Sequence, residues 1–215
     1  PDTGGAFSDL FGREGGVILV NGKVKPSLKV RKGKQQRWRV INAARTRYYT
    51  IRHNRQPFIR LGGDNGLAER SETLDQIKLV PSERTDFVFT PQDEPGTVDW
   101  LKWYPTERGY GSTFNRFSEE MMEIVTVNEP GVMPESIPTE LRHIEQIDVA
   151  GARELLIDLT IVFPDDNTVE MGINGIPYWN SKPLEAQIGE THVWTVRNDT
   201  DFNHPFHLHG YFFQV

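Results

Sequence analysis

Three of the six histidines of this 215-residue chain, His204, His207 and His209, lie within six consecutive positions. Imidazole is the most common metal ligand in proteins and suits copper, zinc, iron and nickel. In an extended strand, His207 and His209 project from the same face because they are two residues apart. His204 lies an odd number of residues before them, with Pro205 directly after it. The spacing indicates that His207 and His209 can serve one metal centre while His204 serves another.

A bare His-x-His pattern is weak evidence, because histidines also cluster by chance or form zinc sites. The longer pattern here is His-Pro-Phe-His-Leu-His-Gly, from His204 to Gly210. It resembles, residue for residue, the His-Pro-x-His-Leu-His-Gly motif of the multicopper oxidases, the laccase-like family. The longer pattern therefore favours copper over a chance cluster.

The resemblance implies a role for each histidine by its position in the motif. His204 would bind the type 1 copper that takes electrons from substrate. His207 would bind the type 2 copper and His209 a type 3 copper of the trinuclear cluster that reduces dioxygen. These three residues would be catalytic through bound copper, and no other cofactor is implied. The nearby Asp201 and Asn203 are candidates for orienting the rings, because metal-bound imidazoles use their second nitrogen for a hydrogen bond.

The chain contains no cysteine. A blue type 1 copper site needs a thiolate beside its two imidazoles. We therefore expect that this chain alone is an incomplete enzyme. The resemblance implies that the remaining ligands come from a first domain and a C-terminal His-Cys-His segment of the same protein, and that dioxygen and a small reducing substrate are its other partners.

Composition excludes several other classes of protein. The net charge of -6 argues against nucleic acid as a partner, and no apolar run approaches the roughly 18 residues of a membrane span. The first five residues do not have the character of a signal peptide, although the resemblance implies a periplasmic or extracellular location. The stretch from Asn21 to Arg39 contains eight basic residues and no acid. Its basic residues alternate with apolar ones, which favours a solvated strand face over a binding patch.

Short alternating segments separated by Gly and Pro turns predict an all-β fold, and no segment has a convincing helical period. Asn21-Gly22 and residues 62–66 and 172–175 are the turn signals. The predicted strands cover residues 16–20, 27–31, 35–41, 48–52, 76–80, 85–90, 98–104, 121–127, 154–161 and 192–196. Many short strands at this spacing are typical of a sandwich or barrel.

Prolines at positions 130, 134 and 138 fall in a polar segment that interrupts the strand pattern. We therefore expect a lead-in loop over residues 1–15, a first module over 16–127, a linker over 128–152 and a second module over 153–215. The resemblance covers the whole chain and assigns 16–127 to the middle cupredoxin-like domain and 153–215 to the first part of the third. It implies tandem Greek-key β-barrels, the second truncated at its C-terminus.

The two modules are related by an internal repeat. A shift of 156 residues places Leu28 on Leu184, Gly33 on Gly189, Trp38 on Trp194, Val40 on Val196 and Asn42 on Asn198. The same shift places Tyr48 on His204, Ile51 on His207 and His53 on His209. A lone His53 is expected to be a surface or packed histidine. The first module is therefore predicted to hold no copper.

The resemblance implies one-electron oxidation of phenolic or aromatic amine substrates coupled to four-electron reduction of dioxygen to water. One alternative is a metal-ion oxidase acting on Cu(I), Fe(II) or Mn(II) in metal homeostasis. Cuprous ion would be favoured by methionine-rich segments, and the chain has only four methionines, with Met121-Met122 the one adjacent pair. The other alternative is a copper-free scaffold member of the same fold, which the complete histidine motif disfavours.

Overall fold

A computed structural model describes residues 12–109, 117–129, 135–166 and 168–215. Most of the predicted lead-in loop and part of the predicted linker lie outside these residues. The prediction of an all-β protein is confirmed: the described residues contain thirteen strands and one 3₁₀ turn, Tyr178–Asn180. That turn is far too short to cross a bilayer, and the described part of the chain has no other helix. Two compact units divide the chain, unit 1 with residues 1–107 and 111–144 and unit 2 with residues 108–110 and 145–215.

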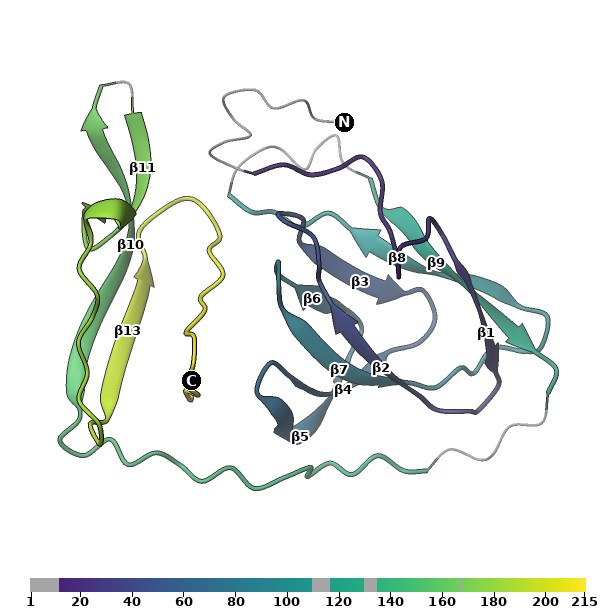
Figure 1. Ribbon diagram of the computed structural model, residues 1–215. Coiled ribbons are helices and arrows are strands. Elements are labelled where there is room, and N and C mark those ends of the chain that lie inside the picture. Colours follow the sequence, from purple (N-terminus) through teal and green to yellow (C-terminus); the bar gives the residue numbers. More distant parts are fainter. Residues whose placement is uncertain (1–11, 110–116, 130–134, 167) are drawn as a thin grey trace. The chain divides into compact units, whose positions relative to one another are not determined.

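Unit 1 contains two β-sheets (Figure 1). One sheet has the strand order β1-β9-β8-β3-β6 and the other the order β2-β7-β4-β5. β1 and β9 pair in parallel, and the other neighbours in these two sheets are antiparallel. The strands are β1 (Ser27–Arg31), β2 (Gln36–Ile41), β3 (Tyr49–His53), β4 (Phe58–Gly63), β5 (Gly66–Leu74), β6 (Ile77–Leu79), β7 (Arg84–Phe89), β8 (Val98–Tyr104) and β9 (Glu119–Val127).

The core of unit 1 is filled by side chains from both sheets. Phe58 of β4 and Phe87 of β7 are fully buried, with their ring centroids 4.8 Å apart. Leu101 and Trp103 alternate with more exposed residues along β8 and join the same cluster. Burying each large apolar side chain contributes about 1.5–3 kcal/mol. This closed core makes unit 1 a rigid support for the polar groups buried within it.

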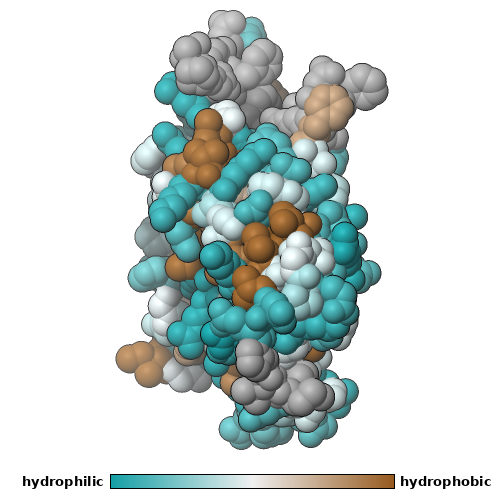
Figure 2. Space-filling model, turned by 90° about the vertical axis from the view of Figure 1, so that its right-hand side faces the viewer, coloured by the Kyte–Doolittle hydropathy of each residue, from teal (hydrophilic) through white to brown (hydrophobic). Residues whose placement is uncertain are grey.

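The basic stretch lies largely on the surface of unit 1, and most of its charges are paired with acids. Figure 2 shows one face of the molecule, on which hydrophilic residues predominate and hydrophobic ones form separate small patches. The ion pairs join Lys25 to Glu120, Arg31 to Glu129, Lys32 to Glu94, and both Arg37 and Arg39 to Asp86. Exposed pairs of this kind contribute little to stability. They support the interpretation of this stretch as a solvated face.

The segment around Gly62 differs from the prediction. The predicted turn is present at Asp64 and Asn65 but is shorter than expected, because Gly62 and Gly63 belong to β4 and β5 begins at Gly66. A Cβ atom on Gly62 would lie 2.0 Å from the carbonyl oxygen of Gly66, so only glycine fits this close backbone approach. The predicted strand over residues 16–20 is also wrong, since only Val20 pairs, through an isolated bridge to Lys23.

Unit 2 contains one sheet with the strand order β12-β11-β10-β13. β10 pairs in parallel with β13 and antiparallel with β11. Ile157 is buried, whereas Leu156, Val193 and Val196 are exposed. The described residues of unit 2 therefore form a single four-stranded sheet. Its strands are β10 (Arg153–Asp165), β11 (Thr168–Ile173), β12 (Ile176–Pro177) and β13 (His192–Asn198).

The internal repeat has counterparts in local backbone conformation. Asn21 and Gly22 have φ angles of 50° and 76°, and Asn174 and Gly175, which align with them once a gap of three residues is allowed, have φ angles of 53° and 74°. Both pairs thus form tight turns that need positive φ at two successive residues, which Asn-Gly allows. β2 also falls on β13 under the shift of 156 residues. The repeat therefore relates the strands that precede Asn42 and Asn198.

Candidate metal centre

The histidine motif follows β13 in unit 2 (Figure 1). Residues 203–208 have no strand pairing, so the strand expected around His207 is not present among the described residues. Nevertheless, the rings of His207 and His209 lie together, with centroids 6.0 Å apart and planes at 61°. Both side chains are exposed. The structure therefore brings these two imidazoles to one place, where neighbouring ions could reach both.

His204 has a different environment from the other two motif histidines. Its ring is partly buried and lies edge-on to Phe202, with centroids 6.4 Å apart. Its Nε2 atom lies 2.9 Å from the Oγ1 atom of Thr200. Burial lowers the pKa of His204, which favours the neutral imidazole that binds metals. Thr200, which the sequence did not single out, therefore makes the kind of hydrogen bond that was sought from Asp201 or Asn203.

A turn after β13 holds Thr200 in place. The Nδ2 atom of Asn198 donates to the carbonyl oxygen of Phe202 at 2.6 Å, and the backbone N–H of Thr200 donates to Asn198 Oδ1 at 3.1 Å. Asn42 closes the equivalent turn after β2 by accepting from the N–H of Ala44 at 3.0 Å and donating to the carbonyl oxygen of Arg47 at 2.8 Å. The sequence repeat paired these asparagines, and that signal could have directed attention to the turn.

His53, the repeat counterpart of His209, is a packed histidine. Its side chain is fully buried in unit 1 and contacts Phe89, with ring centroids 5.0 Å apart. Its Nε2 atom lies 3.7 Å from Asp99 Oδ2, and neither atom makes a hydrogen bond of good geometry with the described residues. Together with Asp93, these residues form a group of ligand atoms that all lie within 4.8 Å of one another.

Two contacts indicate that this group is an ion-pair cluster. The guanidinium of Arg55 already serves as its cation, with Nη1 3.2 Å from Asp93 Oδ1 and Nε 3.4 Å from Asp99 Oδ2. The backbone N–H of Arg55 donates to Nδ1 of His53 at 3.3 Å, which leaves the ring proton on Nε2. A metal ion would need the Nε2 lone pair that this tautomer lacks. The geometry thus favours a neutral His53 facing Asp99.

Comparisons with known proteins show which protein family the chain resembles. The multicopper oxidase family profile matches residues 148–215, which include all three motif histidines. The chain is 32% identical over 205 residues to the multicopper oxidase LPR1 of Arabidopsis thaliana and 28% identical over 218 residues to a laccase of Bacillus subtilis. Each alignment covers 94% of this chain but only 35% and 39% of those proteins. Residues 148–215 therefore match the multicopper oxidase family, and the chain as a whole is similar to members of that family over 94% of its own length.

Solved structures of multicopper oxidases have the same fold as this chain. The McoA multicopper oxidase of Aquifex aeolicus matches with a TM-score of 0.77 at 24% identity, over 93% of this chain and 45% of that one. A multicopper oxidase from Campylobacter jejuni, described as a metallo-oxidase, matches with a TM-score of 0.75 at 22% identity, over 95% and 45%. The predicted tandem cupredoxin-like fold is confirmed.

The motif side chains fit copper by their chemistry. All three are imidazoles, the donor type that copper shares with zinc and iron. Two are exposed and adjacent, and the third is partly buried with one ring nitrogen held by a hydroxyl. The three imidazoles therefore lie in two different environments. The type 1 thiolate has no source in this chain, because it contains no cysteine.

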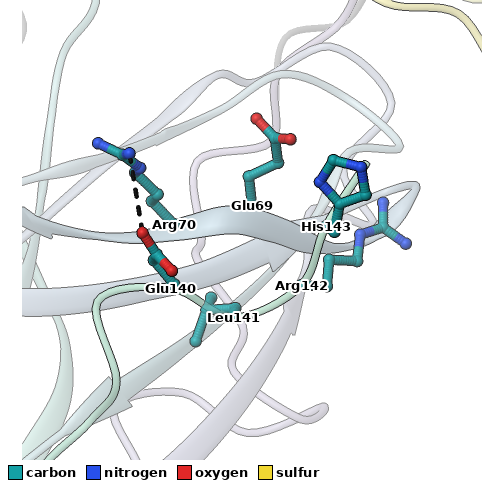
Figure 3. A pocket seen from close by; sticks show the side chains of 6 residues that line it. All are labelled: Glu69, Arg70, Glu140, Leu141, Arg142 and His143. Carbon is teal, nitrogen blue, oxygen red and sulfur yellow. Dashed lines mark ion pairs between the residues drawn. The ribbon is translucent and has the colours of Figure 1, made fainter. Parts of the chain in front are cut away.

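Figure 3 shows an open pocket of unit 1, between β5 and the segment that follows residue 138. This segment, expected as linker, runs beside β5: the N–H of Ser71 donates to the Thr139 carbonyl at 2.8 Å and that of Leu141 to the Glu69 carbonyl at 2.7 Å. Acids and bases are mixed on the pocket wall, where Arg70 and Glu140 lie 3.9 Å apart. A mixed, exposed lining indicates no particular ligand class.

The stability of unit 1 is expected to fall on mild acidification because of His53. Burial, the largest effect, lowers the pKa of His53, while Asp99 and Asp93 raise it and Arg55 lowers it. As pH falls through about 6.5, the unfolded chain binds a proton that folded His53 does not. The free energy of unfolding should therefore drop by up to about 1.4 kcal/mol per pH unit, until the pH reaches the folded pKa. Urea unfolding between pH 8 and pH 5 measures this.

Two glutamine variants separate the effect of His53 from that of other groups. His53→Gln should be less stable than wild type at pH 8 and should lose less stability on acidification. His143→Gln, at an exposed position of the same unit, should follow the wild-type curve. A wild-type protein that gains stability below pH 6.5 relative to His53→Gln would show that Asp99 and Asp93 dominate over burial.

Proposed function

We propose that this chain carries part of the copper centres of a multicopper oxidase that couples one-electron oxidation of phenolic or aromatic amine substrates to reduction of dioxygen to water. The observation that carries the proposal is the arrangement of the motif. His207 and His209 lie together, whereas His204 contacts Thr200 and Phe202. The names of the relatives, multicopper oxidases and laccases, support the same reaction class.

In this proposal, His204 binds the type 1 copper, His207 the type 2 copper and His209 a type 3 copper. When bound, the copper ions take up single electrons from the substrate and deliver four of them to dioxygen. Residues 16–127 form the middle domain without copper, and residues 153–215 form the first part of the copper-binding third domain. The complete protein adds a first domain and a His-Cys-His segment, and we place it in the periplasm or outside the cell.

The protein contributes orientation more than reactivity to this site. The hydrogen bond to Thr200 and the edge of Phe202 restrict the ring of His204, so an ion bound there meets a pre-oriented ligand. His207 and His209 are exposed, and their adjacent rings offer two imidazole donors to a multinuclear cluster. Both arrangements bind and orient metal before any substrate arrives.

A metal-ion oxidase is the second candidate, because the Campylobacter jejuni structure is described as a metallo-oxidase. Cuprous ion is the least favoured substrate of this kind. Met121 is buried in the core of unit 1 and Met122 packs against it, so this pair does not present thioether ligands to a soluble ion. Iron(II) and manganese(II) then remain as metal substrates to compare with phenols. A copper-free scaffold is the third possibility, and copper analysis excludes or supports it.

Oxygen consumption by the complete protein tests the function. With copper bound, it should oxidise a methoxyphenol in air, with one dioxygen consumed for four substrate molecules. The 215-residue chain given the same copper should remain inactive, because it lacks a thiolate. Higher kcat/KM for Fe(II), Mn(II) or Cu(I) than for the phenol would favour the metal-ion oxidase. Phenol oxidation by the 215-residue chain itself would contradict the proposed division of ligands.

A further inference from the structure

The hydroxyl of Thr200 lies at the centre of a small hydrogen-bond network. Its Oγ1 atom is 2.7 Å from Asn198 Oδ1, 3.3 Å from the carbonyl oxygen of Phe202 and 2.9 Å from His204 Nε2. The backbone N–H of Phe202 donates to the same hydroxyl at 3.1 Å. A threonine hydroxyl has one proton to donate. The direction of each hydrogen bond therefore decides the protonation of the His204 ring.

The amide of Asn198 fixes the first direction. Its Oδ1 atom accepts from the backbone N–H of Thr200 and its Nδ2 atom donates to the carbonyl oxygen of Phe202. Both partners are backbone groups with a fixed role, so the amide cannot be flipped without losing two hydrogen bonds. Asn198 therefore presents an acceptor oxygen to the hydroxyl of Thr200.

The hydroxyl proton consequently points to an oxygen and not to the imidazole. If it pointed to His204, two acceptor oxygens would face each other at 2.7 Å without a proton between them. With the proton directed to Asn198, Oγ1 accepts from Nε2–H of His204. The ring is then the Nε2–H tautomer, and its Nδ1 atom keeps the lone pair that a metal requires.

We propose that Thr200 is a positioning residue, which fixes the Nε2–H tautomer of His204 and so reserves Nδ1 for copper. This inference rests on the proposed role of His204. The repeat supports it, because the first module has Ala44 and Tyr48 at the positions of Thr200 and His204. Its turn forms with alanine there, since Asn42 still accepts from the N–H of Ala44. Threonine is thus not needed to form the turn. It is present in the second module, which has the histidine, and absent from the first module, which does not.

The first test observes the tautomer without any metal. Two-bond ¹H–¹⁵N correlations are recorded on the copper-free complete protein with ¹⁵N-labelled histidine, and His204→Gln identifies the signals. The wild type and Thr200→Ser should show a protonated Nε2 on His204 with an Nε2–H signal protected from exchange with water. Thr200→Ala, which copies the first module, should lose that protection. An Nδ1–H tautomer in the wild type would overturn the proposal.

The second test measures copper at the type 1 site. The blue absorption is followed while a copper chelator is added. Thr200→Ala should lose type 1 copper at a chelator concentration about 10–100-fold lower than wild type, and Thr200→Ser should retain it. Equal retention in Thr200→Ala and wild type would overturn the role of Thr200 and leave the proposed function intact. A wild-type protein with no blue copper would instead refute the function, and the role of Thr200 with it.

Discussion

Replacing His204 with alanine in the complete protein is expected to abolish the blue type 1 absorption and to lower substrate oxidation at least about 100-fold. Loss of a residue that merely orients a ligand costs about 10–100-fold in metal affinity or activity, so loss of the ligand itself should cost at least as much. Copper bound through His207 and His209 should stay, because His204 belongs to a separate, partly buried site. Absorption spectra with copper analysis check both parts.

A matched control for this variant is His143→Ala, which removes an exposed imidazole from unit 1. It should keep the blue band, the copper content and the activity of the wild type. A blue band that persists in His204→Ala would contradict the type 1 assignment. Loss of all copper from that variant would show that the three histidines form one interdependent site.

Replacing His207 or His209 with alanine should have the opposite spectral effect. The blue band should persist, the copper content should fall, and oxygen consumption should decrease at least about 100-fold. The physical reason is the adjacency of the two rings, with centroids 6.0 Å apart, since in the proposed function each ring is a ligand of the same cluster. Copper analysis, electron paramagnetic resonance and oxygen uptake give the three quantities.

These variants also test whether the two rings act together. Since both are exposed, neither substitution should change the free energy of unfolding of the copper-free protein by more than about 0.5 kcal/mol. Normal copper content in both variants would show that the rings are adjacent without sharing a cluster. Loss of the blue band from either would place that histidine at the type 1 site.

Strands in which apolar and polar residues clearly alternate could be predicted from the sequence. The predicted strands at 27–31 and 98–104 match β1 and β8. The strand ends at Gly62 and Gly66 could not be predicted, because a glycine-rich segment indicates a turn whether its glycines form the loop or, as at Gly62, allow two flanking strands to approach closely. The predicted strand at 16–20 failed because an apolar run alone does not provide a paired neighbour.

In the candidate site, too, some features are visible in a short stretch of sequence and others depend on the folded structure. The types and spacing of the three motif histidines are local, so the sequence could supply them. The role of Thr200 depends on the turn after β13, which folds its hydroxyl back onto a ring four residues later. The burial of His53 beside Asp99 depends on the packing of β3 against β8. Neither could be derived from spacing in one sequence.

Anomalous diffraction at the copper edge from crystals of the copper-loaded complete protein tests the central claim most directly. We expect one copper peak at the Nδ1 atom of His204 and separate peaks at the imidazole nitrogens of His207 and His209. No copper should lie at the cluster of His53, Asp93 and Asp99, whose cation is Arg55. A crystal with no copper at the three motif histidines, or with copper at His53, would contradict the account.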